Sequence, residues 1–377
     1  MKFPLLLPVL AATTLVAAPR PAAAQVKACK TGSIVVGNPS YKGTDRPAPA
    51  GVKATADPPL GVRAMVFKGK TMYTSSGEDV WAIDLAGGTM RRVAGQHSPK
   101  LTFADGPCDK ARFQNIHGLT LLSDGSIVVA DFAAGALLKI TSPDDPAACK
   151  VSYHAGTSTP ADSTVAQSGD ADGPPGTGKL LWPEWPAADA AGNVYVIDAT
   201  TAKLRKVAPD RTISTVTTLP GGGSPTYEGL TLLGGKLYTI SNGANTGIVT
   251  EIDPATGKVR KVFEGGYRQI VEIPPGRAPV LSAITSDGKD LFITGSGFVW
   301  RLTTAGKISH VAGKAIESEL PRGYDVNAPH PPKDLYLRIR NGDATTTGAL
   351  SALAYHDGSL YYRGRADGVY VVKIDCK

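Results

Sequence analysis

After its first 25 residues, the 377-residue sequence contains no apolar run of about 18 residues, the length that a membrane-spanning helix needs. Stretches with helical periodicity are scarce, whereas glycine and proline are abundant, at 43 and 29 residues. The hydrophobic fraction of 42% is normal for a globular chain and argues against extensive disorder. We therefore predict a folded chain with little helix and no membrane span.

Cysteine is also scarce and forms no metal-binding motif. The four cysteines are Cys29, Cys108, Cys149 and Cys376, and because no C-x-x-C spacing occurs, we predict no zinc knuckle. An even cysteine number in an exported chain indicates two disulfides. The formal net charge of +7 is scattered in pairs rather than blocks, so we predict no nucleic-acid binding.

The first 24 residues have the pattern of a secretory signal peptide. Lys2 is followed by an apolar core and by three alanines at 22–24, which predicts cleavage before Gln25. A membrane anchor is the weaker alternative, because the apolar core is short and interrupted by proline. No lipobox precedes Cys29. We predict an exported protein, periplasmic or extracellular, and a monomer.

Familiar catalytic motifs are missing as well. The sequence has no G-x-S-x-G elbow and no H-E-x-x-H pair. The run GPPGTGK at 173–179 resembles a Walker A loop, but Leu180 stands where that loop needs Ser or Thr. The following LWPEWP cannot begin the helix that would face the phosphates. We interpret this run as a connecting loop.

Residues 104–131 and 171–198 are two copies of one repeat. Both begin Ala-Asp-Gly-Pro and end in an apolar, Gly-containing hairpin that closes on Asp at the same offset. Similar hairpins occur near residues 65, 230, 283 and 352, and a second pair of alternating runs follows each one. Six units of four short strands, about 45 to 65 residues apart, predict an all-β, six-bladed propeller. The predicted blades of this single domain, residues 25–377, are about 60–94, 95–156, 157–219, 220–266, 267–313 and 314–377.

The last unit ends after its third strand, and the missing strand is at the other end of the chain. Residues 28–38, ACKTGSIVVGN, resemble the fourth strands of the other units. We predict that they pair with the C-terminal GVYVVKIDCK and close the ring, which removes unpaired strand edges. Closure places Cys29 beside Cys376 and predicts a disulfide between them. Cys108 with Cys149 then follows by elimination.

The segment DGPCDKARFQNIHGLTLLSDGSIVVAD, residues 105–131, resembles an NHL repeat, whose family forms six-bladed β-propellers. The resemblance is specific in the second unit and fair in the third, whereas the other four keep only hairpin spacing and endings such as VRKV and HVAG. The blade layout is also similar, more distantly, to gluconolactonase-like propellers and peptidyl-amidoglycolate lyases. Because this fold serves ligand-binding scaffolds and several enzymes, the resemblance does not specify a function.

The starts of the innermost strands converge on one mouth of the central channel. Alignment of the hairpins places six residues at one ring position: Arg63, His117, Glu184, Glu228, Leu281 and Leu350. An imidazole and two carboxylates in consecutive blades can bind one divalent ion, Ca²⁺ or Zn²⁺, with an open position for water. The resemblance supports this, because the gluconolactonase-like and lyase propellers hold their metal near this mouth. The alternative is that Arg63 pairs with both carboxylates while His117 only hydrogen-bonds the loop.

Two tryptophans, Trp182 and Trp185, flank Glu184 in LWPEWP. Aromatic rings beside a carboxylate at a concave mouth suit stacking on a sugar ring or an apolar ligand. Packing between blades is an equal alternative. Asp131 and Asp198 end the second strands of their units, and the resemblance implies a structural role for both at the turn.

Three longer insertions, at 36–60, 157–182 and 314–345, all join a fourth strand to the next first strand and so lie on the mouth face. This concentration favours a scaffold that binds a small molecule, a glycan or a protein there. The alternative hypothesis is a metal-dependent lyase or lactone hydrolase, with His117, Glu184 and Glu228 as the metal ligands. The sequence leaves open whether the protein is an enzyme, and it predicts no cofactor other than that metal.

Overall fold

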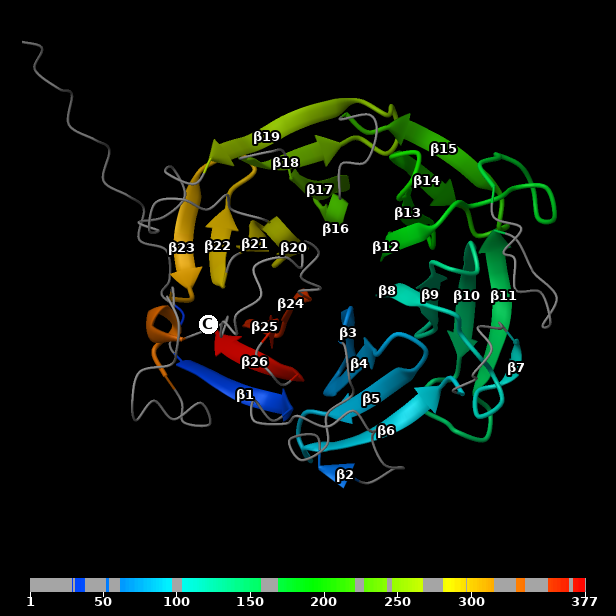
Figure 1. Cartoon of the computed structure of the whole chain (residues 1–377), viewed down its shortest axis with the longest axis horizontal. Helices are drawn as coiled ribbons and strands as arrows, with labels where there is room; N and C mark the ends of the chain where they lie inside the picture. Colours follow the sequence, from blue (N-terminus) through cyan, green and yellow to red (C-terminus); the bar gives the residue numbers. More distant parts are fainter. Residues whose placement is uncertain are drawn as a thin grey trace, which may run out of the picture.

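The protein is a six-bladed β-propeller closed between its two ends, as the repeats predict (Figure 1). The computed structural model describes residues 29, 31–37, 52–53, 62–96, 104–156, 169–220, 227–242, 246–266, 281–295, 297–314, 330–335, 352–365 and 369–376. The predicted signal peptide, residues 1–24, lies outside these residues, as does Leu350.

Six antiparallel sheets surround one axis, and each sheet is a blade. The strands of blade one are, from the axis outward, β3 (Met65–Lys68), β4 (Thr71–Ser75), β5 (Val80–Asp84), β6 (Thr89–Ala94) and β2 (Val52–Lys53). Those of blade two are β8 (Ile116–Leu121), β9 (Ile127–Asp131), β10 (Ala136–Thr141), β11 (Lys150–Gly156) and β7 (Gly106–Pro107). Both blades thus carry a fifth, two-residue strand at the outer edge, which the four-strand repeat does not predict.

The next three blades have four strands each. Blade three consists of β12 (Pro183–Ala188), β13 (Val194–Asp198), β14 (Lys203–Val207) and β15 (Ile213–Thr218). Blade four consists of β16 (Tyr227–Leu233), β17 (Lys236–Asn242), β18 (Thr246–Ile252) and β19 (Val259–Gly266). Blade five consists of β20 (Leu281–Ser286), β21 (Leu291–Gly295), β22 (Phe298–Leu302) and β23 (Ile308–Ala312).

Blade six closes the ring. Its strands are β24 (Leu353–His356), β25 (Ser359–Arg365), β26 (Val369–Asp375) and the N-terminal β1 (Thr31–Gly37). The antiparallel register of β1 and β26 runs from Thr31 opposite Asp375 to Gly37 opposite Tyr370. The predicted Cys29–Cys376 disulfide is present directly beyond this pairing, so the closing strand is also held covalently.

The core lies between blades rather than inside a single layer. Each of the six interfaces between neighbouring blades contains its own cluster of buried apolar side chains. The second strand of a blade is covered on both faces, and β9 and β13 are therefore buried at every residue. This explains why their sequences, IVVAD and VYVID, read as continuous apolar runs instead of alternating ones.

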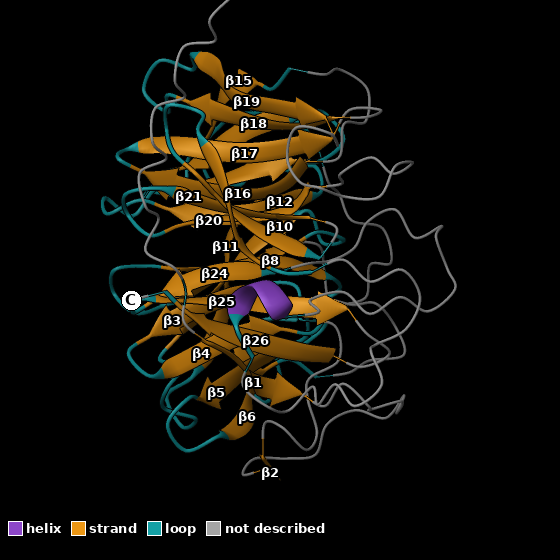
Figure 2. Ribbon diagram, turned by 90° about the vertical axis from the view of Figure 1, so that its left-hand side faces the viewer, coloured by secondary structure: helices purple, strands orange, loops and turns teal. Residues whose placement is uncertain are grey.

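Helical structure is almost absent from the part of the chain that the structure describes. Strands make up most of it in the side view, and the one helical segment there is the 3-10 turn η1 (Pro332–Asp334) (Figure 2). Among the described residues, no helix is long and apolar enough to cross a membrane.

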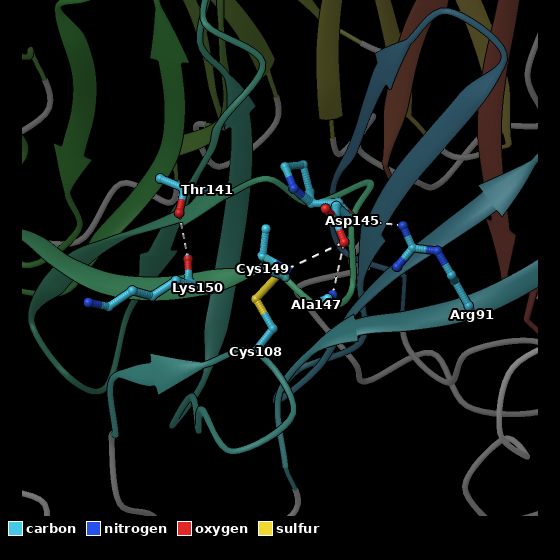
Figure 3. The surroundings of a disulfide bond; sticks show 9 residues. Arg91, Cys108, Thr141, Asp145, Ala147, Cys149 and Lys150 are labelled. Atoms are coloured by element: carbon cyan, nitrogen blue, oxygen red, sulfur yellow. Dashed lines mark hydrogen bonds between the residues drawn. A yellow bond between two sulfur atoms is a disulfide. The ribbon is translucent and has the colours of Figure 1, made fainter.

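The second predicted disulfide, Cys108–Cys149, is present at the outer edge of blade two (Figure 3). Cys108 directly follows β7, Cys149 directly precedes β11, and these two strands pair with each other. The backbone N–H of Cys108 also donates to the carbonyl oxygen of Cys149 at 3.1 Å. The bond therefore fixes the Ala-Asp-Gly-Pro segment of the repeat against its own blade.

Candidate functional site

The innermost strands of all six blades line a central cavity of about 300 Å³. Its lining residues are 63–66, 118–120, 185–188, 229–232, 283–285 and 352–354. Apart from Arg63 and three threonines, these residues are small or apolar. Polar chemistry is therefore concentrated where the inner strands begin, at one mouth of the channel.

Strand register identifies the equivalent mouth residues. In blades two to five, the first residue of the inner strand pairs with a residue at the end of the second strand. These pairs are Ile116 with Asp131, Pro183 with Asp198, Tyr227 with Ser241, and Leu281 with Gly295. The residue that follows each of these is His117, Glu184, Glu228 and Ser282. By this register Ser282, rather than Leu281, is equivalent to His117, and the bulge after Leu281 in β20 matches the bulge after Ile116 in β8. Ser282 is buried, and its hydroxyl donates to Thr294 O at 3.3 Å.

His117 and Glu184 connect blades two and three at the mouth. His117 Nδ1 lies 2.6 Å from Glu184 Oε1, and the two side chains are 17% and 16% exposed. The other ring nitrogen, Nε2, has no hydrogen-bond partner among the described residues. The pair thus fixes the imidazole and leaves one polar ring atom for a ligand.

Arg63 belongs to the same cluster, although it does not bond a carboxylate directly. One terminal nitrogen, Nη1, donates to Asn115 Oδ1 at 3.0 Å. Burial lowers the pKa of Arg63, and the negative charge of Glu184 opposes this change. Among the described residues no ion pair joins Arg63 to either carboxylate, although the charge of Glu184 acts on it.

Glu228 is the member of the cluster with the fewest hydrogen-bond partners among the described residues. Its carboxyl group makes no hydrogen bond or ion pair with any described residue. Burial raises the pKa of Glu228 to about 8, and the nearby charge of Glu184 adds to the rise. The group is therefore predominantly a neutral carboxylic acid at pH 7, able to donate one hydrogen bond as well as accept.

An aromatic stack leads from His117 to solvent. The His117 ring stacks on Phe132 with centroids 4.1 Å apart, and Phe132 stacks on Trp182 at 5.2 Å. Trp182 is 43% exposed, which is unusual here for a large apolar side chain. Phe132 was not singled out in the sequence, although its place directly after Asp131, at the mouth-side end of β9, is the signal that could have found it.

The two tryptophans have different roles. Trp185 packs between blades three and four, and its indole N–H donates to Tyr227 O at 3.0 Å. Trp182 keeps an open face. Both residues have positive φ, 54° and 53°, a conformation that bulky side chains seldom adopt unless the surroundings impose it.

Asp131 and Asp198 hold the backbone that leads into the mouth. The Asp131 carboxylate accepts hydrogen bonds from the backbone N–H groups of Gln114, Asn115 and Ala134 at 2.7, 2.9 and 3.3 Å. Asp198 accepts from the backbone N–H of Leu181 at 3.1 Å, directly before Trp182. The structural role expected for both aspartates is confirmed, and it positions His117 in one blade and Trp182 in the next.

The proposed metal ligands do not form a metal-binding group in this arrangement. Across the described residues, no set of three or more His, Cys, Asp or Glu side chains is placed to hold one ion. His117 and Glu184 contact each other, Arg63 adds a positive charge beside them, and Glu228 is held neutral. This donor set fits a hydrogen-bonding ligand better than a cation, because a cation would be repelled by the guanidinium.

The Walker-like run 173–179 forms a turn at the outer edge of blade three, far along the sheet from the inner strand. Its backbone bridges Ala171 to Lys179 and Gly173 to Ile213. Buried Leu180 follows, and then the inner strand β12 begins without any intervening helix. The interpretation as a connecting loop agrees with this geometry.

Comparison with known proteins identifies the fold and not a family. No family model matches the sequence, and no curated protein matches it. The NHL resemblance is therefore not confirmed.

Solved structures that match are propellers of low sequence identity. An auxiliary nutrient binding protein from Bacteroides thetaiotaomicron is 10% identical, with a TM-score of 0.59 over 92% of this chain and 76% of its own. One from Bacteroides ovatus is 13% identical, with a TM-score of 0.57 over the same shares. A gluconolactonase from Xanthomonas campestris is 11% identical, with a TM-score of 0.51 over 94% of this chain and 98% of its own. The chain thus has a fold similar to nutrient-binding proteins and to an enzyme, so the mouth residues must carry any argument about function.

Proposed function

We propose that residues 25–377 form an exported propeller domain that binds a small molecule at the channel mouth formed by Arg63, His117, Glu184, Glu228 and Trp182. The observation that carries the proposal is the Glu228 carboxyl group, which is partly buried near Glu184 and has no hydrogen-bond or ion-pair partner among the described residues. A buried polar group without a partner is costly, and a ligand that hydrogen-bonds it recovers that cost. The similarity in fold to nutrient-binding proteins is consistent with this function.

Export is part of the proposal. It is supported by the two disulfides, which persist in oxidising compartments, and by the N-terminal pattern of residues 1–24. We propose the periplasm or the extracellular space, and a monomeric state.

A thermal-shift screen of small metabolites against the mature protein tests the binding function. We expect at least one compound to raise the melting temperature, since a ligand that binds only the folded state stabilises it. The shift should be lost in Glu228→Ala and His117→Ala and kept in Lys179→Ala, whose side chain is on the outer edge of blade three. Prior treatment with a chelator should not change the shift. Equal shifts in all three variants would show that the mouth is not the binding site.

A further inference from the structure

We infer that the central cavity behind the mouth binds a small organic carboxylate, with the carboxylate on the guanidinium of Arg63 and the uncharged body of the ligand between the innermost strands. The inference concerns the cavity itself, so it goes beyond binding at the mouth and shares only Arg63 with that function. Neither the His117–Glu184 pair nor Trp182 takes part in it.

The first argument is the charge of the cavity lining. Among the described residues that line this cavity of about 300 Å³, Arg63 is the charged one, and none is Asp or Glu. The others are apolar residues, glycines and three threonines. A cationic ligand would be repelled by the guanidinium and would meet no counter-charge in the lining, whereas an anionic ligand would be attracted. The lining therefore favours an anionic group.

The second argument is the set of hydrogen-bond donors that Arg63 still offers. Its Nη1 donates to Asn115 Oδ1 at 3.0 Å, which orients the guanidinium without neutralising it, because an amide is uncharged. Its Nε and Nη2 make no hydrogen bond with any described residue. These two nitrogens form one edge of the guanidinium, and such an edge binds a carboxylate through two parallel hydrogen bonds. A carboxylate thus fits the free donors in number and geometry.

Glu184 is the protein carboxylate that could compete for Arg63. Its negative charge acts on Arg63, but no ion pair joins the two among the described residues. One oxygen of Glu184 instead lies 2.6 Å from His117 Nδ1. Glu184 does not line the cavity, although the next residue, Trp185, does. Arg63 therefore keeps positive charge to offer to a ligand inside the cavity.

The third argument is the space available for the body of the ligand. Four inner strands carry alanine or glycine directly after the mouth position, at Ala64, Gly118, Gly229 and Ala283, and all four residues line the cavity. An apolar cavity of about 150 Å³ holds benzene. The observed volume of about 300 Å³ therefore has room for one ring or a short chain together with its carboxylate.

Other anions fit the cavity less well. Inorganic phosphate would supply the charge but has no body to occupy the remaining space. A dicarboxylate would bring a second negative charge into a lining that has one cationic residue among those described. Burying that second charge without a partner would be unfavourable. The arrangement therefore favours a single carboxylate on an uncharged body.

The experiment compares three probes of one shape and different charge: benzoate, benzamide and benzylamine. Binding to the mature wild-type protein is measured at pH 7 by ligand-observed NMR titration, which detects weak binding. Acetate and inorganic phosphate complete the series as anions without a ring. We expect benzoate to bind roughly tenfold or more tightly than benzamide or benzylamine, and more tightly than acetate or phosphate.

Variants of Arg63 locate the carboxylate. Arg63→Met should weaken benzoate binding roughly tenfold or more. Arg63→Lys should restore part of it, since the charge remains while the two-nitrogen edge is lost. Arg260→Met is the matched control and should bind like the wild type, because Arg260 lies on the outer strand β19 and pairs with Glu251. Circular dichroism checks that each variant is folded.

A variant of the lining locates the body. Ala64→Leu enlarges a residue that lines the cavity, so it should weaken the binding of benzoate more than that of acetate. A preference for benzamide or benzylamine, or benzoate binding that Arg63→Met leaves unchanged, would overturn the inference. Equal affinity for benzoate, acetate and phosphate would overturn it as well, because the cavity would then not hold the body.

The outcomes also separate this inference from the proposed function. If benzoate does not bind but another compound stabilises the wild type and not Glu228→Ala, the cavity inference is wrong and binding at the mouth remains. If benzoate binding depends on Arg63 but Glu228→Ala and His117→Ala affect the binding of no compound, the cavity site remains and the proposed binding at the mouth is wrong.

Discussion

Blades two and three repeat the same outer-edge turn but secure it by different chemistry. In blade two, Ala104 bridges Arg112, and Pro107 O accepts hydrogen bonds from Lys110 N and Ala111 N. In blade three, Ala171 bridges Lys179, and Pro174 O accepts from Thr177 N and Gly178 N. The backbone pattern is the same at every one of these positions, including the residues that spell the Walker-like run.

What holds each turn to its blade differs. In blade two the bond is covalent, between Cys108 and Cys149. In blade three the fully buried Arg205 bonds three carboxylates, Asp170, Asp172 and Asp198, at 3.0, 2.8 and 2.7 Å. Burial raises the pKa of Asp198 to about 7, while the charge of Arg205 opposes the rise. One repeat geometry can thus be stabilised by a disulfide or by an ion cluster around a buried arginine. The aspartates Asp172 and Asp198 belong to the repeat, whereas Arg205 and the two cysteines have no counterpart in the other copy.

The largest expected effect is the loss of the ion cluster. Arg205→Met should lower the free energy of unfolding by about 3–5 kcal/mol at pH 8, because buried Asp198 loses its counter-charge. Urea unfolding measures it. Lys203→Met is the matched control: it lies on the same strand and bonds the same Asp170, but it is partly exposed, so it should cost less than about 1 kcal/mol. If both variants unfold alike, the cluster does not stabilise blade three.

The covalent counterpart should have a somewhat smaller effect. Cys108→Ala combined with Cys149→Ala should lower the free energy of unfolding by about 2–4 kcal/mol, since the bond closes a loop of 41 residues in the unfolded chain. The measurement is urea unfolding without reductant, with Cys29–Cys376 left intact. A double variant as stable as the wild type would mean that the β7 edge contributes nothing to blade two.

A further contrast between neighbouring blades is found at the mouth, where Glu184 bonds His117 and Glu228 has no hydrogen-bond partner among the described residues. The pKa of Glu228 is raised from 4.5 to about 8 in the folded protein, so the folded state holds this proton more tightly than the unfolded state. The resulting stability is present at low pH and is lost as pH rises toward and through 8. Between pH 6 and 9 the wild type should therefore lose roughly 2 kcal/mol relative to Glu228→Gln.

Thermal or urea unfolding across this pH range checks the Glu228 prediction. Glu251→Gln, on the outer half of the same blade, is the control. The bonds of Glu251 to Arg260 and Tyr238 lower its pKa, so it stays ionised from pH 6 to 9 and its replacement should add no slope. Parallel pH profiles for the wild type and Glu228→Gln would show that Glu228 is not a neutral acid in the folded protein.

The smallest change in stability is expected at Lys179, in the outer-edge turn of blade three. Lys179→Ala should change the free energy of unfolding by no more than about 0.5 kcal/mol, because the bridge to Ala171 is made by backbone atoms. Equilibrium dialysis should find no ATP bound to the wild type or to the variant. Tight ATP binding that disappears in Lys179→Ala would show that the run does bind phosphate.

The repeat pattern predicted the fold because strand period, turn residues and repeat length are local features. Hairpins such as LTLLGGKLYT need two residues with positive φ, and Gly234 and Gly235 supply them at 59° and 75°. Three of the predicted mouth residues share a local position for the same reason, since His117, Glu184 and Glu228 are the second residues of their inner strands, whereas Arg63 lies two residues before β3. The alignment differs from the register at Leu281, where Ser282 takes the position equivalent to His117.

The number of blades, the closing strand and the two cysteine pairs could be predicted from the sequence, because each depends on order along the chain. The hydrogen-bond partners of the mouth residues could not be predicted in this way. In the folded protein His117 bonds Glu184, Arg63 bonds Asn115 and Trp185 packs between blades. Trp182 is exposed, and Glu228 has no hydrogen-bond partner in the part of the chain that the structure describes. The physical reason is that hydrogen bonding and burial depend on what neighbouring blades place within a few ångströms, which strand periodicity does not encode.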